Sequence, residues 1–294
     1  MSNQVPAWQG PILDNHFHLN RNGRYLDAAH DFKRAGGTNI VLIHCPDFAS
    51  PPTTKEGHRA AYQNTIAMAE SVRTELDLHV RVVLGPHPAA FAHQFIEWVE
   101  QEGAKGKNRA IENYRDSIDE AVKFYHEGKA HAIGEVGRPH WEVSQEIWDL
   151  SNDLLCETMS LAANDGFALQ LHVEGELEST YSDMAAMAEK SGLQKDRLIR
   201  HYSPPNVEAK ITQGLTPSVL AGKGALATLL ATAEQCSHGF MLETDYMDDL
   251  RRPGAVLGPK TVPKRTNQLL NAGIDEELLW RAHVDLPNEL YGQE

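Results

Sequence analysis

Short apolar, β-branched runs alternate with longer amphipathic stretches along the 294 residues of the chain. Runs such as Ile40–Ile43 are apolar on both faces, which is typical of parallel strands covered by helices on each side. The pattern predicts eight strands, at Pro11–His18, Thr38–His44, Leu78–Gly85, Ala130–Val136, Phe167–Val173, Arg197–Tyr202, Thr216–Ala221 and Gly239–Asp245.

Helical spacing of apolar residues separates these runs, most clearly at Gly57–Arg73, Ser144–Ala163 and Val207–Gln213. Eightfold alternation of strand and helix predicts a (β/α)8 TIM barrel, a fold of about 250 residues. A doubly wound open sheet is the main alternative. It would place a glycine-rich phosphate-binding turn after an early strand, and the sequence has no such turn. We therefore expect one TIM-barrel domain over residues 1–294.

The segment Glu97–Gly128 is longer and more polar than one crossover helix requires. Its charged centre, Gln101–Arg109, is expected to be a solvated loop between two helices, because runs of charge usually lie at the surface.

The chain is acidic, with 27 Lys and Arg against 41 Asp and Glu and a net charge of -14. This balance disfavours broad adhesion to nucleic acid or to an anionic membrane, but it allows a small anionic substrate at a local cationic site. No signal-peptide pattern is visible near Met1, and no apolar run approaches the roughly 20 residues that span a bilayer. The sequence predicts a cytoplasmic protein without a membrane partner, and it does not indicate the oligomeric state.

Histidines and carboxylates occur where several of the expected strands end. The C-terminal ends of parallel barrel strands meet at one rim, where active sites form. His16 and His18 end the first strand, and their side chains share a face because strand side chains alternate. Later strands contribute four more candidates: Glu135, His172, His201 and Asp245. Any one alone would usually be structural, but six at strand ends favour a metal site, and they suffice for two divalent ions with a shared bridging carboxylate.

Four short motifs indicate a family. Asp14–Leu19 has the sequence D-N-H-F-H-L, Gly85–Pro88 is G-P-H-P, Gly134–Gly137 is G-E-V-G and Leu242–Asp245 is L-E-T-D. Their order and spacing resemble those of TatD-type metal-dependent hydrolases, of the amidohydrolase-like superfamily. The resemblance implies a barrel hydrolase with divalent ions. It assigns metal ligation to His16, His18, Glu135, His172, His201 and Asp245.

Two segments depart from the family pattern. Arg138-Pro139-His140 stands where the family usually has L-D, and Tyr202–Pro205 stands where it often has C-F-S-G. These departures place the chain closer to a divergent, archaeal-type branch than to the DNases. They fall at positions expected to line the pocket. The resemblance therefore predicts the fold and the metal ligands better than it predicts the substrate.

The expected mechanism uses two ions per chain, whose identity among Zn, Mn, Mg, Fe and Ni the sequence does not distinguish. In this hypothesis Glu135 bridges both ions. His16, His18 and Asp245 hold one ion, and His172 and His201 hold the other. A water between the ions would lose a proton readily, and Asp245 would accept that proton. Glu135 and Asp245 are therefore the predicted catalytic residues.

Charge favours a phosphoester substrate, because two divalent ions against two carboxylates leave the site positive by about two units. Arg138 could add a bidentate contact to phosphate oxygens, although a structural cation is equally compatible with its position. His87 and Tyr202 are the other predicted substrate contacts, with packing roles as their alternatives. The acidic chain favours a small-molecule phosphoester or the end of a nucleic acid.

Two other functions stay open. The first is hydrolysis of carboxylic esters, lactones or amides, as in related barrels that commonly bridge their metals with a carboxylated lysine. The fourth strand here supplies Glu135 instead. The second is a non-catalytic metal-bound scaffold, for which we would expect the loss of a ligand, whereas all six are present.

Overall fold

The computed structural model describes residues 7–175 and 178–293. Eight parallel strands occur in this part of the chain, and their order in the sheet is their order in the sequence. Their bounds are β1 Leu13–Phe17, β2 Asn39–Ile43, β3 His79–Leu84, β4 Ala132–Gly137, β5 Leu169–His172, β6 Leu198–Ser203, β7 Thr216–Leu220 and β8 Met241–Glu243. Each expected strand is found within a few residues of its expected bounds.

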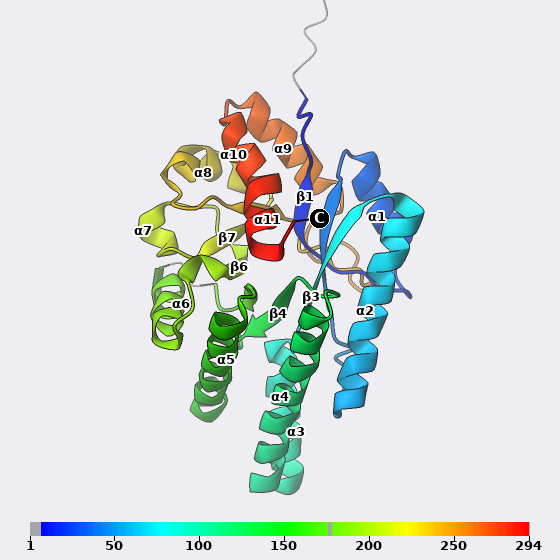
Figure 1. Ribbon diagram of the computed structural model, residues 1–294, viewed down its shortest axis with the longest axis vertical. Helices are drawn as coiled ribbons and strands as arrows, with labels where there is room; N and C mark the ends of the chain where they lie inside the picture. The colour runs from blue at the N-terminus through cyan, green and yellow to red at the C-terminus, as the bar shows by residue number, and fades with distance from the viewer. Residues whose placement is uncertain (1–6, 176–177, 294) are drawn as a thin grey trace, which may run out of the picture. The chain divides into compact units, whose positions relative to one another are not determined.

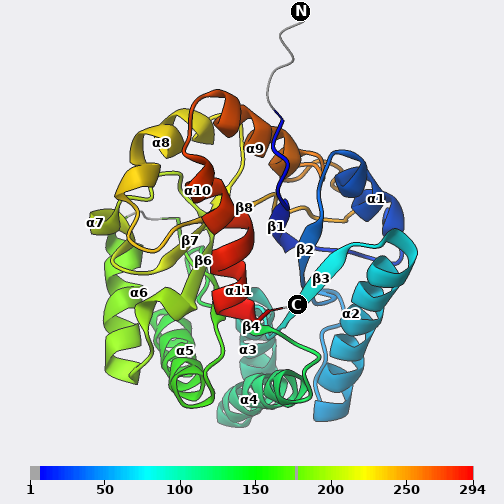
Figure 2. The ribbon, with the colours of Figure 1, turned by 45° about the horizontal axis from the view of Figure 1, so that its top comes forward.

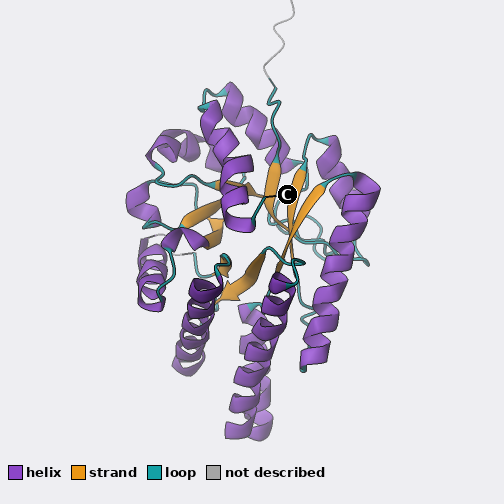
Figure 3. Ribbon diagram, in the orientation of Figure 1, coloured by secondary structure: helices purple, strands orange, loops and turns teal. Residues whose placement is uncertain are grey.

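Helices alternate with the strands (Figures 1 and 3). They are α1 Leu26–Arg34, α2 Lys55–Leu76, α3 Pro88–Glu102, α4 Ala104–His126, α5 Gln145–Asp165, α6 Glu178–Ser191, α7 Ala209–Thr212, α8 Ala225–Thr232, α9 Thr261–Asn271, α10 Glu276–Trp280 and α11 Leu286–Tyr291. The order of elements confirms the predicted (β/α)8 fold. In the described part of the chain, no helix has both the length and the apolar character needed to cross a membrane.

The chain divides into two compact units. Unit 1 takes its described residues from Met1–Leu42, Met68–Arg81 and His201–Glu294, and unit 2 takes them from Ile43–Ala67 and Val82–Arg200. Strands β1, β7 and β8 lie wholly in unit 1, and β4 and β5 lie wholly in unit 2. The expectation of a single domain stays a prediction.

In unit 1, β1 lies beside β8 (Figure 2). The amide of His18 donates to the carbonyl of Tyr246 at 2.9 Å, and Phe17 forms a parallel bridge with Tyr246. Apolar side chains of β7, β8 and α9, among them Val219 and Leu242, are fully buried and form the core of this unit. The pairing brings the C-terminal ends of β1 and β8 together.

In unit 2, β4 pairs in parallel with β5, so that Gly137 lies opposite His172. Strand β3 pairs with β4 on its other side, with Leu84 opposite Ile133. A Cβ at Gly85 would lie 2.9 Å from the amide nitrogen of Gly134, so the chain just after β3 must be glycine to pass this close. The ends of β3, β4 and β5 are therefore neighbours.

The prediction of a loop at Gln101–Arg109 is wrong. Helix α3 ends at Glu102 and α4 begins at Ala104, with only Gly103, at φ 60°, between them. The two helices lie side by side (Figure 1), and a Cβ at Gly106 would lie 1.9 Å from a carbonyl oxygen of α3. Arg109 stacks 4.0 Å from the Trp98 ring, so part of this polar run covers apolar surface as a helix.

Candidate metal centre

Three imidazoles and one carboxylate gather in unit 1, where β1, β6 and β8 end. The Nε2 atoms of His16 and His18 lie 3.0 Å apart, and Oδ1 of Asp245 lies 3.8 Å from the first and 3.7 Å from the second. The ring of His201 stacks on that of His16, with 3.8 Å between centroids. Ligand atoms of His16, His201 and Asp245 all lie within 4.8 Å of one another. The structure thus brings together four of the six predicted ligands.

His201 is held by a buried carboxylate that the sequence interpretation did not assign to the site. Its Nδ1 lies 3.0 Å from Oε1 of Glu243, a residue with 0% exposure. Glu243 also accepts hydrogen bonds from the amide of Tyr202 at 2.7 Å and from the hydroxyl of Ser218. Because an ionised carboxylate only accepts, Nδ1 of His201 carries the proton and Nε2 keeps its lone pair for an ion.

Asp14, the first residue of the D-N-H-F-H-L motif, connects β1 to the segment that carries Asp245. Its carboxylate accepts from the Thr244 amide at 2.9 Å and from the Thr244 hydroxyl at 2.6 Å. Complete burial raises the pKa of Asp14 to about 7, against the opposing effect of these hydrogen bonds. Asp14 therefore fixes the backbone between the two ligand-bearing strands rather than facing an ion itself.

The backbone turns sharply at two predicted site residues. Asp245 has φ 47° and Tyr202 has φ 52°, values that non-glycine residues rarely adopt. Tyr202 is 53% exposed, which is compatible with the predicted contact to substrate. That role stays a prediction.

A second cluster lies in unit 2, where β3, β4 and β5 end. Oε2 of Glu135 lies 2.6 Å from Nδ1 of His172 and 3.7 Å from Nε2 of His87. Glu135 is buried, with 3% exposure. The imidazole of His87 also caps α3, since its Nδ1 accepts from the amide of Ala89 at 3.0 Å. His87, expected as a substrate contact, is thus placed as a candidate ligand beside Glu135 and His172.

Arg138 is placed differently from its predicted role. Its guanidinium is 3% exposed, forms two hydrogen bonds with Glu174, and contacts Oδ2 of Asp183 at 2.5 Å. It also lies 4.3 Å from the ring of Trp148. These contacts favour the structural alternative that the sequence left open, because the donors that would hold a phosphate already face carboxylates.

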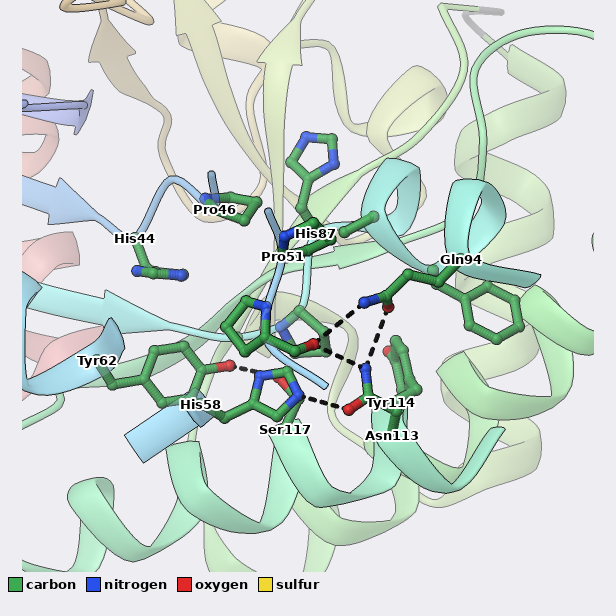
Figure 4. Close-up of a pocket in the computed structure, with 15 residues that line it drawn as sticks. His44, Pro46, Pro51, His58, Tyr62, His87, Gln94, Asn113, Tyr114 and Ser117 are labelled. Carbon is green, nitrogen blue, oxygen red and sulfur yellow. Dashed lines mark hydrogen bonds between the residues drawn. The ribbon is translucent and has the colours of Figure 1, made fainter. Parts of the chain in front are cut away.

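A small pocket of about 30 Å³ lies beside His87 in unit 2 (Figure 4). Its polar side chains hydrogen-bond with one another: the Tyr62 and Ser117 hydroxyls lie 2.6 Å apart, and Nε2 of His58 lies 3.0 Å from Oδ1 of Asn113. Burial lowers the pKa of His58, which keeps its ring neutral. None of the 15 described lining residues is Asp, Glu, Lys or Arg. The pocket therefore suits an uncharged group.

Both clusters fit divalent ions by their donor sets. Imidazole nitrogens mixed with carboxylate oxygens suit borderline ions such as zinc and also manganese, iron or nickel. In each unit a group of three ligand atoms lies within 4.8 Å, close enough to contact one ion. A shared cation would also account for the facing Nε2 atoms of His16 and His18, which otherwise compete for one proton.

Comparisons with known proteins place the chain in a family. The family model described as TatD related DNase matches residues 13–292. An uncharacterized protein of Methanocaldococcus jannaschii is 30% identical over 285 residues, which are 96% of this chain and 95% of that protein.

Two solved structures show the same fold. A TatD-like protein from Archaeoglobus fulgidus superposes with a TM-score of 0.63 at 16% identity, covering 95% of this chain and 99% of its own. A TatD homolog from Escherichia coli gives a TM-score of 0.60 at 16% identity, covering 96% and 98%. The match of the family model over nearly the whole chain shows that this protein belongs to the TatD related DNase family of metal-dependent hydrolases.

Proposed function

We propose that the protein hydrolyses phosphoester bonds with a water activated by divalent ions held at the two clusters. The observation that carries this proposal is the charge of the clusters. In unit 1, Asp245 is the carboxylate grouped with neutral imidazole ligands, and in unit 2 it is Glu135. One divalent ion leaves a positive charge of about one unit over the ligands of either cluster, and in unit 1 Glu243, which contacts His201, offsets part of that charge. The remaining positive charge favours a substrate with anionic phosphoryl oxygens.

The proposed roles keep the six predicted ligands but move His201 from the ion of His172 to the ion of unit 1, because its ring stacks on that of His16. His16, His18, His201 and Asp245 would hold an ion in unit 1, and Glu135 and His172 would hold an ion in unit 2. Bound divalent ions supply Lewis acidity toward water and phosphoryl oxygens. Oδ1 of Asp245 then accepts the proton of the attacking water, and the carboxyl group returns it to the leaving oxygen.

The pocket beside His87 supports a small or terminal phosphoester. Its volume of about 30 Å³ is room for a few atoms, and no charged residue lines it in the described chain, so it disfavours a second phosphate there. An exposed aromatic such as Tyr202 could stack on a base or sugar at the open side of unit 1. A long polyanion would be disfavoured by the net charge of -14.

The test uses chelator-treated protein reloaded with Mn, Zn or Mg, and p-nitrophenyl phosphate, bis-p-nitrophenyl phosphate, a short 5′-phosphorylated oligonucleotide and p-nitrophenyl acetate as substrates. We expect metal-dependent release from at least one phosphoester and none from the acetate. Turnover of the acetate alone would favour the carboxylic-ester alternative. Metal binding without any turnover would favour the scaffold.

Asp245→Asn tests the proton acceptor. We expect turnover to fall by at least about 10²-fold, because the amide cannot accept the proton, while most of the metal stays bound. Asp77→Asn is a matched control, since it makes the same chemical change at a fully exposed side chain that is not a candidate ligand. Near-normal activity of Asp245→Asn would refute its assignment.

A further inference from the structure

Arg138–His140 is the segment that departs from the family pattern. In unit 2 its first residue contacts the C-terminal end of β5. The amide of Arg138 donates to the carbonyl of His172 at 3.1 Å. Gly137, at φ 152°, permits this approach, since a Cβ there would lie 2.0 Å from the same carbonyl oxygen. The backbone of the candidate ligand His172 is therefore fixed from the β4 side.

The Arg138 side chain makes a second contact with the segment that follows His172. It is paired in a bidentate manner with Glu174, two residues after His172. The Glu174 carbonyl in turn accepts from Nη2 of the buried Arg200 at 3.1 Å. A bidentate ion pair with one buried partner constrains the segments that carry it. Arg138 thus contacts the chain at the His172 carbonyl and again at Glu174, two residues later.

His140 contacts the ring itself. Its Nδ1 lies 2.8 Å from Nε2 of His172, and the two ring centroids are 4.8 Å apart. The other nitrogen of His172, Nδ1, lies 2.6 Å from Oε2 of Glu135. Each nitrogen of the His172 ring thus has a defined neighbour, a carboxylate on one side and an imidazole on the other.

We propose that His140 is a positioning residue for His172, and that Arg138–His140 together set the place and the tautomer of this ligand. When an ion is shared by Glu135 and Nδ1 of His172, the remaining proton of the His172 ring is on Nε2, and Nδ1 of His140 accepts it. The outer hydrogen bond of a metal-binding histidine fixes its tautomer and its direction. The proposal rests on the proposed function in one respect only, namely that an ion binds at Glu135.

A matched pair of variants tests the acceptor. His140→Asn keeps an oxygen near the position of Nδ1, whereas His140→Leu has nearly the same shape and no polar atom. His140 is exposed, so neither change should disturb folding. In zinc-free protein Nδ1 of His172 faces the Glu135 carboxylate and carries the ring proton, so Nε2 accepts from Nδ1–H of His140; the amide group of His140→Asn can replace that donor as well as the acceptor needed when an ion is bound. Long-range ¹H–¹⁵N correlation reports the ring nitrogens of His172 in this state. We expect the leucine substitution to shift the His172 Nε2 resonance and the asparagine substitution to leave it close to that of the wild-type protein.

Zinc titration supplies the second readout, followed at the His172 resonances because the cluster in unit 1 is expected to bind zinc too. We expect zinc to bind Nδ1 in the wild-type protein while Nε2 keeps its proton. The dissociation constant at this cluster should rise about tenfold in His140→Leu, the low end of the range for outer hydrogen bonds since His140 is exposed, and stay within about threefold in His140→Asn.

Equal losses in both variants would show that His140 is itself a ligand and would overturn the proposal, as would unchanged affinity in both. A wild-type protein that binds no zinc would contradict the proposed function instead. In that case the zinc-free spectra decide alone: a His172 Nε2 resonance unmoved by either substitution refutes the positioning role.

Discussion

The stability of unit 1 should depend on the protonation of His283, a fully buried imidazole far in sequence from the cluster. Its Nδ1 accepts from the Leu13 amide at 3.1 Å, and its Nε2 lies 3.0 Å from the Thr266 hydroxyl. The Thr266 hydroxyl itself donates to a carbonyl, so the His283 ring donates from Nε2 and is neutral. Burial lowers the pKa of His283 to about 4.

The sign and the size of the effect follow from this shift. The unfolded chain protonates this histidine below about pH 6.5, whereas the folded protein resists protonation down to about pH 4. The unfolded state therefore binds more protons in this window, and stability falls as the pH falls. The loss is about 2 kcal/mol between pH 8 and pH 5, and it approaches about 3 kcal/mol below pH 4.

His283→Asn removes the titration and keeps an oxygen acceptor for the Leu13 amide. The variant should be less stable than the wild-type protein at pH 8, because it loses the contact with Thr266. On acidification the difference should shrink by about 2 kcal/mol by pH 5, since only the wild-type protein pays the protonation cost. Urea unfolding at 25 °C, followed by tryptophan fluorescence at pH 8, 7, 6 and 5, measures this difference.

The difference between the two proteins isolates His283, because other titrating groups such as Asp14 are present in both and cancel. Curves of unfolding free energy against pH that stay parallel from pH 8 to pH 5 would refute the reasoning. A wild-type protein that gains stability relative to the variant on acidification would refute it as well.

Three other perturbations have defined outcomes. Glu243→Gln should weaken zinc binding by His201 about 10- to 100-fold, because the amide can present its NH₂ group to the ring. Zinc titration followed at the ring ¹⁵N resonances of His201 measures this change, and unchanged affinity would contradict the role of Glu243. Arg138→Met should lower the free energy of unfolding by about 2 kcal/mol, less than the cost of breaking a fully buried pair, because Glu174 loses its cation but keeps partial contact with water. A loss below about 0.5 kcal/mol in urea unfolding would argue against this ion pair. Removing metal with a chelator should lower the melting temperature, and adding back zinc at 100 times its dissociation constant should restore about 2.7 kcal/mol for each cluster that binds an ion. Equal melting curves with and without zinc would count against both clusters.

The strands could be predicted from the sequence because short apolar, β-branched runs are typical of buried parallel strands. It failed at Gln101–Arg109 because a helix that faces solvent has the same polarity as a loop. The signal that could have corrected it lies just downstream. Ala110, Tyr114 and Ile118 recur at helical spacing, are buried, and extend the helix back through Arg109.

The candidate ligands were predictable because histidines and carboxylates at strand ends are rare by chance. Their hydrogen-bond partners were not, since these depend on side-chain directions that no motif specifies. Glu243 had one usable signal, its alternation with Asp245 along the last strand, which places both side chains on one face. Arg138 had none, because Glu174 and Asp183 lie on other elements and meet it only in the folded unit.

The two clusters differ in the charge of the groups that orient their histidines. His201 donates to the buried carboxylate Glu243, whereas Nε2 of His172 faces the neutral ring of His140. A carboxylate partner raises the basicity of the ligand and partly neutralises a bound cation, and an imidazole partner fixes direction without adding charge. If both clusters hold ions as proposed, the ion beside His172 keeps more of its positive charge. That side is then the better place to polarise a phosphoryl oxygen, and the His201 side is the better place to retain an ion.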